Sequence, residues 1–171
     1  MANQNLKFIF FGTPDVASKT LSILKERGYM PELIVTSPDK QSGRGLQMHE
    51  TPVALWAKEN NIQCLKPEKI DGKFISKLGT WNFQLSIVVA YGKILPESLI
   101  KMPELGTINI HYSLLPKYRG ASPLEACLLN GDEITGVSIQ QMEYKLDSGG
   151  ILKEEKIEIG INDTKEELRE E

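Results

Sequence analysis

Cysteine and histidine are scarce in this chain of 171 residues, which contains two of each. Cys64 and Cys127 form no CxxC motif, and no histidine stands at a spacing typical of a zinc site. The sequence therefore argues against a disulfide scaffold and predicts two buried free thiols and no bound metal. His49 lies in a polar segment and is interpreted as a solvated side chain without a role.

Long apolar runs are also lacking. The longest, around Leu85 to Ala90, is far shorter than the roughly 18 residues that a membrane-spanning helix needs. The first five residues, Met-Ala-Asn-Gln-Asn, have no charged segment leading into an apolar core, as a secretion signal would. We therefore expect a soluble, cytoplasmic protein with no membrane partner, and we expect a monomer.

Neither sign of charge is in large excess, since the formal net charge is −3. The segment from Leu152 to Glu171 holds 4 basic and 8 acidic residues, which leaves 16 basic and 15 acidic residues before it. Neutralisation of phosphates dominates affinity for nucleic acids. Binding of a nucleic acid therefore requires a local basic patch or a further basic domain.

Strand and helix patterns alternate along most of the chain. Leu6 to Phe11 is a β-prone apolar run, Gly12 interrupts it, and a helix capped by Thr13 with Pro14 at its first position is predicted up to Gly28. Further strands are predicted over 32–36, 63–65, 84–90 and 106–113, and further helices from 51, from about 96 and from 121. This alternation predicts an α/β fold built on an open, mainly parallel sheet.

The remaining segments depart from that pattern. Residues 135–143 and 151–159 alternate as strands and are expected to pair around 146–150, and Ser122 with Glu125 has capping-box spacing. A helix is predicted to start at 163–166, about two turns before the chain stops, so residues 1–171 are interpreted as one domain truncated in its last helix. Residues 37–50 have no periodicity, and loops of this length are typically functional or disordered.

Two polar side chains end a predicted strand. Asn109 and His111 are two residues apart, so they emerge on one face near the carboxyl end of the strand, where open α/β sheets place their sites. Two interpretations remain open from these residues alone. The pair forms a functional site, or His111 ends the strand in solvent while Asn109 bonds a neighbouring main chain.

Asp147 lies in a predicted turn beside Gly149 and Gly150. A turn aspartate taken alone favours a local cap of the main chain. A functional role becomes the stronger interpretation only when the whole segment from Asn109 to Asp147 is considered.

That segment closely resembles the signature of the folate-dependent formyltransferases. The likeness is carried by residues 109–120, which read NIHYSLLPKYRG, followed by GD at 131–132, TGVSI at 135–139, Met142 and LDSG at 146–149. The resemblance implies the Rossmann-like form of the α/β fold, with helices on both faces of the sheet. It also implies 10-formyltetrahydrofolate as co-substrate.

The resemblance also implies roles for particular residues. Asn109, His111 and Asp147 match the family's catalytic asparagine, histidine and aspartate. A second set matches its formylfolate-binding segments and comprises Ser113, Leu114, Leu115 and Pro116, together with Val89, Tyr91, Gly92, Ile94 and Leu95.

Within the family, the likeness is closest to the branch that formylates initiator methionyl-tRNA. Residues 11–15 (FGTPD) resemble its first strand, and residues 38–53 resemble its inserted loop that reaches the tRNA, with Arg44 as the candidate contact. A solvated Arg44 is the alternative. That branch carries a C-terminal β-rich tRNA-binding domain, which is absent from residues 1–171, so weak binding of tRNA is implied.

The chemistry expected of the site follows from formyl transfer. A neutral amine attacks the formyl carbon, and Asn109 with protonated His111 is expected to donate to the developing oxyanion. Asp147 is expected to favour the imidazolium and to accept the proton of the amine, directly or through water. Two alternatives remain: a sugar-nucleotide N-formyltransferase, which shares the same motif, and a non-catalytic α/β binding module.

Overall fold

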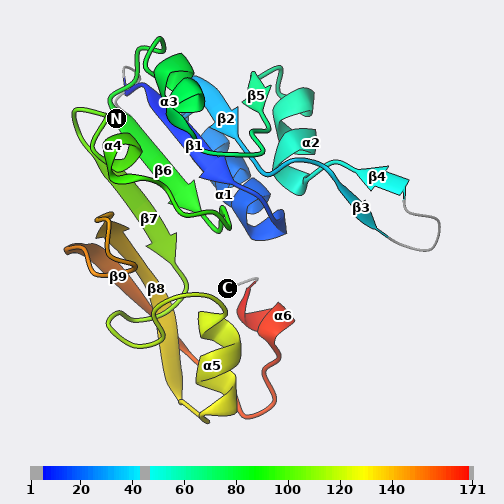
Figure 1. Ribbon diagram of the computed structural model, residues 1–171. Coiled ribbons are helices and arrows are strands. Elements are labelled where there is room, and N and C mark those ends of the chain that lie inside the picture. Colours follow the sequence, from blue (N-terminus) through cyan, green and yellow to red (C-terminus); the bar gives the residue numbers. More distant parts are fainter. Residues whose placement is uncertain (1–5, 43–46, 170–171) are drawn as a thin grey trace. The chain divides into compact units, whose positions relative to one another are not determined.

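The computed structural model describes residues 6–42 and 47–169. The chain forms two compact units, the first ending at Thr107 and the second beginning at Ile108. Both units combine strands and helices (Figure 1). The predicted α/β class is confirmed. None of the helices in the described ranges has the length and apolarity that a bilayer crossing requires.

The first unit is built on four parallel strands in the order β5-β2-β1-β6 (Figure 1). Their bounds are Phe8–Gly12 (β1), Leu33–Val35 (β2), Cys64–Leu65 (β5) and Leu85–Val89 (β6). Every residue of β1 and β2 is buried. A parallel strand covered on both faces needs a continuous apolar run, which is the pattern by which β1 and β6 were predicted.

The described residues of this unit form four helices: Asp15–Glu26 (α1), Pro52–Glu59 (α2), Gly72–Leu78 (α3) and Glu97–Ile100 (α4). Thr51 caps α2 by accepting a hydrogen bond from the Ala54 amide at 3.1 Å. The predicted Thr13 cap of α1 is wrong, because Pro14 is the N-cap and no side chain caps it. The Thr13 hydroxyl donates instead to the Tyr91 carbonyl oxygen at 2.9 Å.

Three elements were not predicted from the sequence. Within the long segment 37–50, Lys40–Ser42 (β3) and Gln47–His49 (β4) pair as an antiparallel hairpin. The third is α3, which is capped by Asp71. These elements are short, and none carries the apolar periodicity that reveals a strand or helix in sequence.

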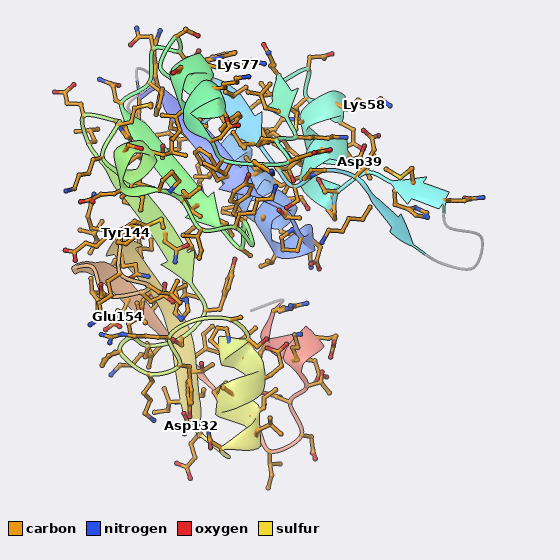
Figure 2. All side chains as sticks on the ribbon, viewed as in Figure 1. Asp39, Lys58, Lys77, Asp132, Tyr144 and Glu154 are labelled. Carbon is orange, nitrogen blue, oxygen red and sulfur yellow. The ribbon has the colours of Figure 1, made fainter. Side chains whose placement is uncertain are left out.

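An ion-pair cluster joins the two ends of the hairpin segment. The Lys66 ammonium lies 2.7 Å from Asp39, which precedes β3, and 3.0 Å from Glu50, which follows β4. Figure 2 labels Asp39 at the base of the hairpin and Lys58 on α2; the Lys58 ammonium lies 3.9 Å from Glu50. Lys66 therefore holds both ends of one loop.

Both cysteines are free, as predicted, although only Cys127 is fully buried. Cys64 is half-buried, and this burial raises the pKa of its thiol to about 11, against the opposing effect of Lys66. The thiol is therefore protonated at neutral pH and is a poor nucleophile.

The second unit contains an antiparallel ladder in the order β7-β8-β9. The strands are Thr107–His111 (β7), Ile134–Gln141 (β8) and Ile151–Glu158 (β9), so the predicted pairing around 146–150 is confirmed. Two helices, Pro123–Leu129 (α5) and Lys165–Leu168 (α6), complete it. Thr164 and Glu167 form a capping box at α6, where a helix start was predicted.

An ion pair joins the two helices of this unit. The predicted capping box of α5 is wrong: Ser122 has φ of +63° and makes no cap hydrogen bond, and Glu125 instead accepts from Lys165 of α6. Leu168 is buried, with 4% of its surface exposed. The last helix therefore packs, contrary to the sequence-based expectation of a helix with nothing to pack on.

Candidate active site

Four polar side chains share one face of the β7–β8 ladder. Asn109 stands opposite Gln140, and His111 stands opposite Ser138. Residues two apart on a strand point to the same face, and directly opposite residues on paired strands do so too. The ladder therefore gathers an amide, an imidazole, a hydroxyl and a second amide on one surface.

The loop after β7 folds onto this surface through Ser138. The Ser138 hydroxyl accepts a hydrogen bond from the Leu115 amide at 3.0 Å and lies 2.7 Å from the Ser113 carbonyl oxygen. Glu154 of β9, labelled in Figure 2, places Oε1 2.9 Å from the same hydroxyl. Because Ser138 has one hydrogen to donate, Glu154 and the Ser113 carbonyl compete for it.

His111 is held by the main chain of the same loop. Its side chain is buried, and Nε2 lies 2.9 Å from the Tyr118 carbonyl oxygen. A carbonyl only accepts, so Nε2 carries a proton and Nδ1 is the ring nitrogen left for other partners. The Tyr118 hydroxyl donates to Asp132 at 2.8 Å and accepts from Asn130 at 3.2 Å, which anchors this carbonyl.

Asp147 faces the other side of the imidazole. Its Oδ2 lies 3.9 Å from His111 Nδ1, and both side chains expose less than a tenth of their surface. The carboxylate is held by two donors: the Gly120 amide reaches Oδ2 at 2.7 Å, and Gln140 Nε2 reaches Oδ1 at 2.8 Å. At 3.9 Å, His111 and Asp147 do not share a direct hydrogen bond, but one atom beside the gap can contact both.

The Asn109 side-chain amide makes no hydrogen bond within the described part of the chain. Asn109 is half-buried on the shared face, and no hydrogen bond joins its side chain to another residue in the described part of the chain. An amide NH2 that is fixed by a strand but unpaired within the protein is free to donate to a bound molecule.

The connection that carries Asp147 is tightly closed. The Gln141 amide donates to the Gly150 carbonyl oxygen at 2.8 Å, and Asp147 itself has φ of +45°. A Cβ atom added at Gly149 would lie 1.7 Å from the Gln141 carbonyl oxygen. Only glycine therefore fits at this position, and the close approach fixes the turn that presents the carboxylate.

The structure thus brings His111 and Asp147 together and puts Asn109 on the same face. Sequence reasoning missed Gln140, Ser138 and the Gly120 amide as partners of the site. The alternation of β8 puts Ser138 and Gln140 on one face of a strand, which is a signal that the sequence contained. Main-chain partners leave no such signal, because every residue carries an amide and a carbonyl.

The predicted folate-binding residues are distributed over both units. Ser113 is fully buried and Leu115 is 7% exposed, and the peptide bond between Leu115 and Pro116 is cis. In the first unit, Ile94 is 83% exposed, whereas Val89, Tyr91 and Leu95 are buried, and Gly92 has φ of +80°. Arg44 lies outside the described residues.

Tyr91 contributes its ring to the core of the first unit. The ring packs edge-on against Phe11 with centroids 5.6 Å apart, and burial raises the pKa of the hydroxyl to about 12. The Tyr91 side chain is therefore not available to a ligand, so any contact of Tyr91 with a ligand is made by its main chain.

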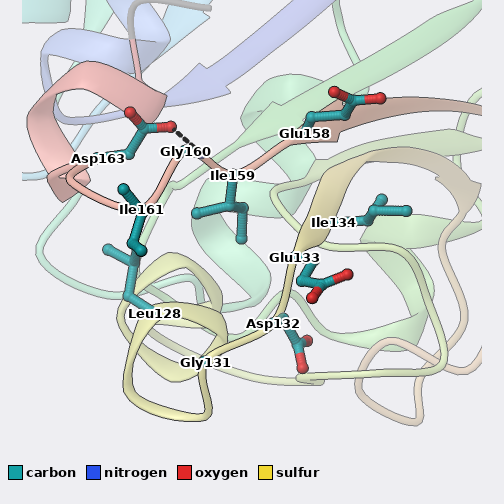
Figure 3. Close-up of a pocket in the computed structure, with 10 residues that line it drawn as sticks. All are labelled: Leu128, Gly131, Asp132, Glu133, Ile134, Glu158, Ile159, Gly160, Ile161 and Asp163. Atoms are coloured by element: carbon teal, nitrogen blue, oxygen red, sulfur yellow. Dashed lines mark hydrogen bonds between the residues drawn. The ribbon is translucent and has the colours of Figure 1, made fainter.

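A separate depression in the second unit, of about 730 Å³, contains none of the predicted site residues (Figure 3). Its wall combines apolar side chains such as Leu128 and Ile134 with the carboxylates of Glu133 and Glu158. The depression lacks both an imidazole and an amide side chain, so we place the candidate active site at His111 and Asp147 instead. No group of three or more His, Cys, Asp or Glu residues in the described ranges is arranged to hold a metal ion.

Solved structures share this fold. Phosphoribosylglycinamide formyltransferase from Bacillus halodurans matches with a TM-score of 0.77 at 20% identity, over 95% of this chain and 84% of that chain. The enzyme from Anaplasma phagocytophilum matches with 0.78 at 22% identity, over 96% and 78%. A sugar 3N-formyltransferase solved with dTDP and 5-N-formyl-THF matches with 0.66 at 20% identity, over 95% and 56%. These likenesses define an α/β protein with the formyltransferase fold.

Sequence comparison narrows the class. The formyl transferase family model matches residues 5–171. A methionyl-tRNA formyltransferase of Geobacter metallireducens is 43% identical over 166 residues, and one of Thermodesulfovibrio yellowstonii is 45% identical over 163 residues. These alignments cover 96% and 95% of this chain and 53% of each relative, so the chain spans about half their length. The chain belongs to the formyl transferase family.

Proposed function

We propose that residues 1–171 form the catalytic part of an enzyme that transfers the formyl group of 10-formyltetrahydrofolate to the amino group of initiator methionyl-tRNA. The observation that carries this proposal is the His111–Asp147 pair, 3.9 Å apart and nearly excluded from water, on the face that holds the unpaired Asn109 amide. The names of the relatives at 43% and 45% identity support the choice of acceptor.

The geometry supports Asn109 and His111 as the oxyanion donors. When the amine nitrogen attacks the formyl carbon, negative charge develops on the formyl oxygen, and preorganised donors stabilise it. Asn109 donates through its unpaired NH2, and His111, in its imidazolium form, donates through Nδ1, because Nε2 already donates to Tyr118. The low exposure of His111 strengthens this interaction, since few water molecules compete for it.

The proton of the attacking amine goes to Asp147. Its Oδ2 faces Nδ1 and accepts one hydrogen bond from Gly120, which leaves capacity for a second donor. As the new C–N bond forms, the bond from the formyl carbon to folate N10 breaks and N10 gains a proton. Asp147 returns the proton that it received, directly or through water, so the reaction is balanced.

The folate is proposed to bind the segments named by their resemblance. Hydrogen bonds to Ser138 of β8 fix the 113–116 loop. This supports a precise position for the end of the folate that carries the formyl group. In the first unit, the contribution of residues 89–95 comes from the main chain and from the exposed Ile94, because the Tyr91 ring is buried. Arg44 is proposed as a contact to the acceptor end of the tRNA.

The proposal is tested with the natural full-length protein. It is given 10-formyltetrahydrofolate with methionyl-tRNA and, in parallel, with amino-sugar nucleotides. Formylation of methionyl-tRNA is expected, and formylation of the sugar alone would replace the proposed acceptor. Arg44→Ala is expected to raise KM for the tRNA while leaving KM for the folate unchanged.

Three substitutions test the site itself. His111→Ala, Asp147→Asn and Asn109→Ala are each expected to lower kcat by roughly 10²-fold. Glu158→Gln removes a carboxylate of the same unit at the depression of Figure 3 and is expected to leave kcat unchanged. Wild-type rates in both His111→Ala and Asp147→Asn would show that this pair does not carry the chemistry, whereas a wild-type protein that formylates no acceptor would support a non-catalytic binding module instead.

A further inference from the structure

Gln140 is a buried polar residue. Side-chain packing alone does not explain why a polar residue occupies this position. Its side chain is 1% exposed, and its Oε1 has no hydrogen-bond partner within the described part of the chain. Burying a carbonyl oxygen without a partner is unfavourable, and an apolar side chain of similar length would avoid this cost. The nitrogen end of the same amide has a partner at the candidate site, because Nε2 donates to Asp147 Oδ1 at 2.8 Å.

That hydrogen bond completes a two-point support for the carboxylate. Gly120 holds Oδ2 and Gln140 holds Oδ1, so rotation of the carboxylate about its Cβ–Cγ bond breaks both contacts. The two supports come from different parts of the unit: one from the loop after β7, the other from β8. Removing Gln140 leaves a single support, and the oxygen that faces His111 Nδ1 is then free to turn away.

We infer that Gln140 is a positioning residue for formyl transfer, which holds the Asp147 carboxylate in the orientation that faces His111. The inference rests on the proposed function. Gln140 acts through Asp147 and has no contact with substrate of its own, since both ends of its amide are buried. Its loss is therefore expected to lower the rate of the chemical step while leaving the binding of folate and tRNA unchanged.

Two variants of the full-length protein separate this role from packing. Gln140→Met keeps length and apolar volume but removes the donor, and we expect kcat to fall by about 10-fold with KM for either substrate changed by less than about 2-fold. Gln141→Met is the matched control, because only the main chain of Gln141 belongs to the turn that carries Asp147, and its side chain points to the opposite face of β8. Thermal unfolding confirms that both variants are folded.

Gln140→Glu gives a readout that packing alone would not change. The variant is isosteric, but its ionised carboxylate repels Asp147, whereas its protonated form donates as the amide does. The ratio of variant to wild-type kcat is therefore expected to rise as the pH falls. The other titratable groups around this position are His111 on β7, Asp147 in the loop and Glu154 on β9, and the ratio to wild type cancels only those of their effects that the substitution leaves unchanged.

A double-mutant cycle with Asp147→Asn decides the inference. If Gln140 acts only through Asp147, Gln140→Met has no further effect on kcat in the Asp147→Asn protein. The inference would be overturned if Gln140→Met lowered kcat by the same factor in the wild-type and Asp147→Asn backgrounds. It would also be overturned if Gln140→Met and Gln141→Met had the same kcat.

Failure of the proposed function gives a different result, because the wild-type protein would then not formylate methionyl-tRNA. In that case, a crystal structure of Gln140→Met decides: an Asp147 carboxylate in its original orientation rejects the inference, and a rotated one supports it.

Discussion

The Nε2 atom of His111 lies 2.9 Å from the main-chain carbonyl oxygen of Tyr118, seven residues further along the chain. This contact selects which ring nitrogen carries the proton and turns Nδ1 toward Asp147. The partner is a carbonyl, which does not change its charge with pH, so Nε2 carries the proton whenever the ring is neutral.

The first prediction concerns the histidine tautomer. Spectra of protein with 15N-labelled histidine are expected to show His111 with a proton on Nε2 whenever the ring is neutral. The chain has only two histidines, so the variant His49→Gln assigns the signals. A neutral His111 ring with its proton on Nδ1 would contradict the structure.

The second prediction concerns the Tyr118 hydroxyl, whose hydrogen bonds hold the residue that supplies the carbonyl partner of His111. Tyr118→Phe removes the hydrogen bonds to Asp132 and Asn130, so the loop that holds His111 has greater freedom. We expect kcat to fall by roughly 5-fold, since two hydrogen bonds, one of them to a carboxylate, are lost away from the reacting atoms. Steady-state kinetics test this expectation. Tyr144→Phe is the control, because Tyr144 is 68% exposed. Equal rates in the two variants would show that the anchor has no role.

The third prediction compares two adjacent glycines. Gly149→Ala places a methyl group 1.7 Å from the Gln141 carbonyl oxygen, whereas an added Cβ at Gly150 has no neighbour within 4 Å. Gly149→Ala is expected to destabilise the fold by about 1 to 3 kcal/mol, as overpacking does, and to lower kcat by displacing Asp147. Gly150→Ala is expected to match the wild type in chemical denaturation and in kinetics. Similar behaviour of the two variants would contradict the close approach at Gly149.

The fourth prediction follows from Lys66. Burial lowers the pKa of its ammonium, but hydrogen bonds to Asp39 and Glu50 outweigh this, so the net pKa lies above the ordinary value of 10.5. A group whose pKa is raised by folding stabilises the protein fully below its unfolded pKa, and this stability is lost as the pH rises through the folded pKa.

The measurement compares stability at neutral and alkaline pH. Lys66→Met is expected to cost about 0.5 to 1 kcal/mol at pH 7, with less difference from wild type above the folded pKa of Lys66. Faster hydrogen exchange in the β3–β4 hairpin is expected to accompany the loss. Lys58→Met is the control, because its 3.9 Å contact to Glu50 is exposed. A cost that did not decrease at alkaline pH would argue against the ion pairs as its cause.

Much of the fold was predictable because it depends on local patterns. The apolar run before Gly12 and the alternation of residues 135–143 and 151–159 each reflect one strand's own burial. The hairpin β3–β4 and helix α3 were missed, because short elements held by caps and ion pairs leave no apolar period. Both predicted caps at Thr13 and Ser122 were wrong, since these residues have other contacts or a different main-chain conformation.

The sequence by itself determined the residue types of the site and their order, and the motif around Asn109, His111 and Asp147 was sufficient to indicate the chemistry. Only the tertiary structure decided the orientations. The Tyr118 carbonyl accepts from Nε2 of His111 and so leaves Nδ1 for other partners. Gly120 and Gln140 hold the Asp147 carboxylate in the orientation that faces Nδ1. These contacts join residues 7 to 27 positions apart, two of them through main-chain groups that every residue has. No sequence pattern distinguishes such groups until folding brings them together.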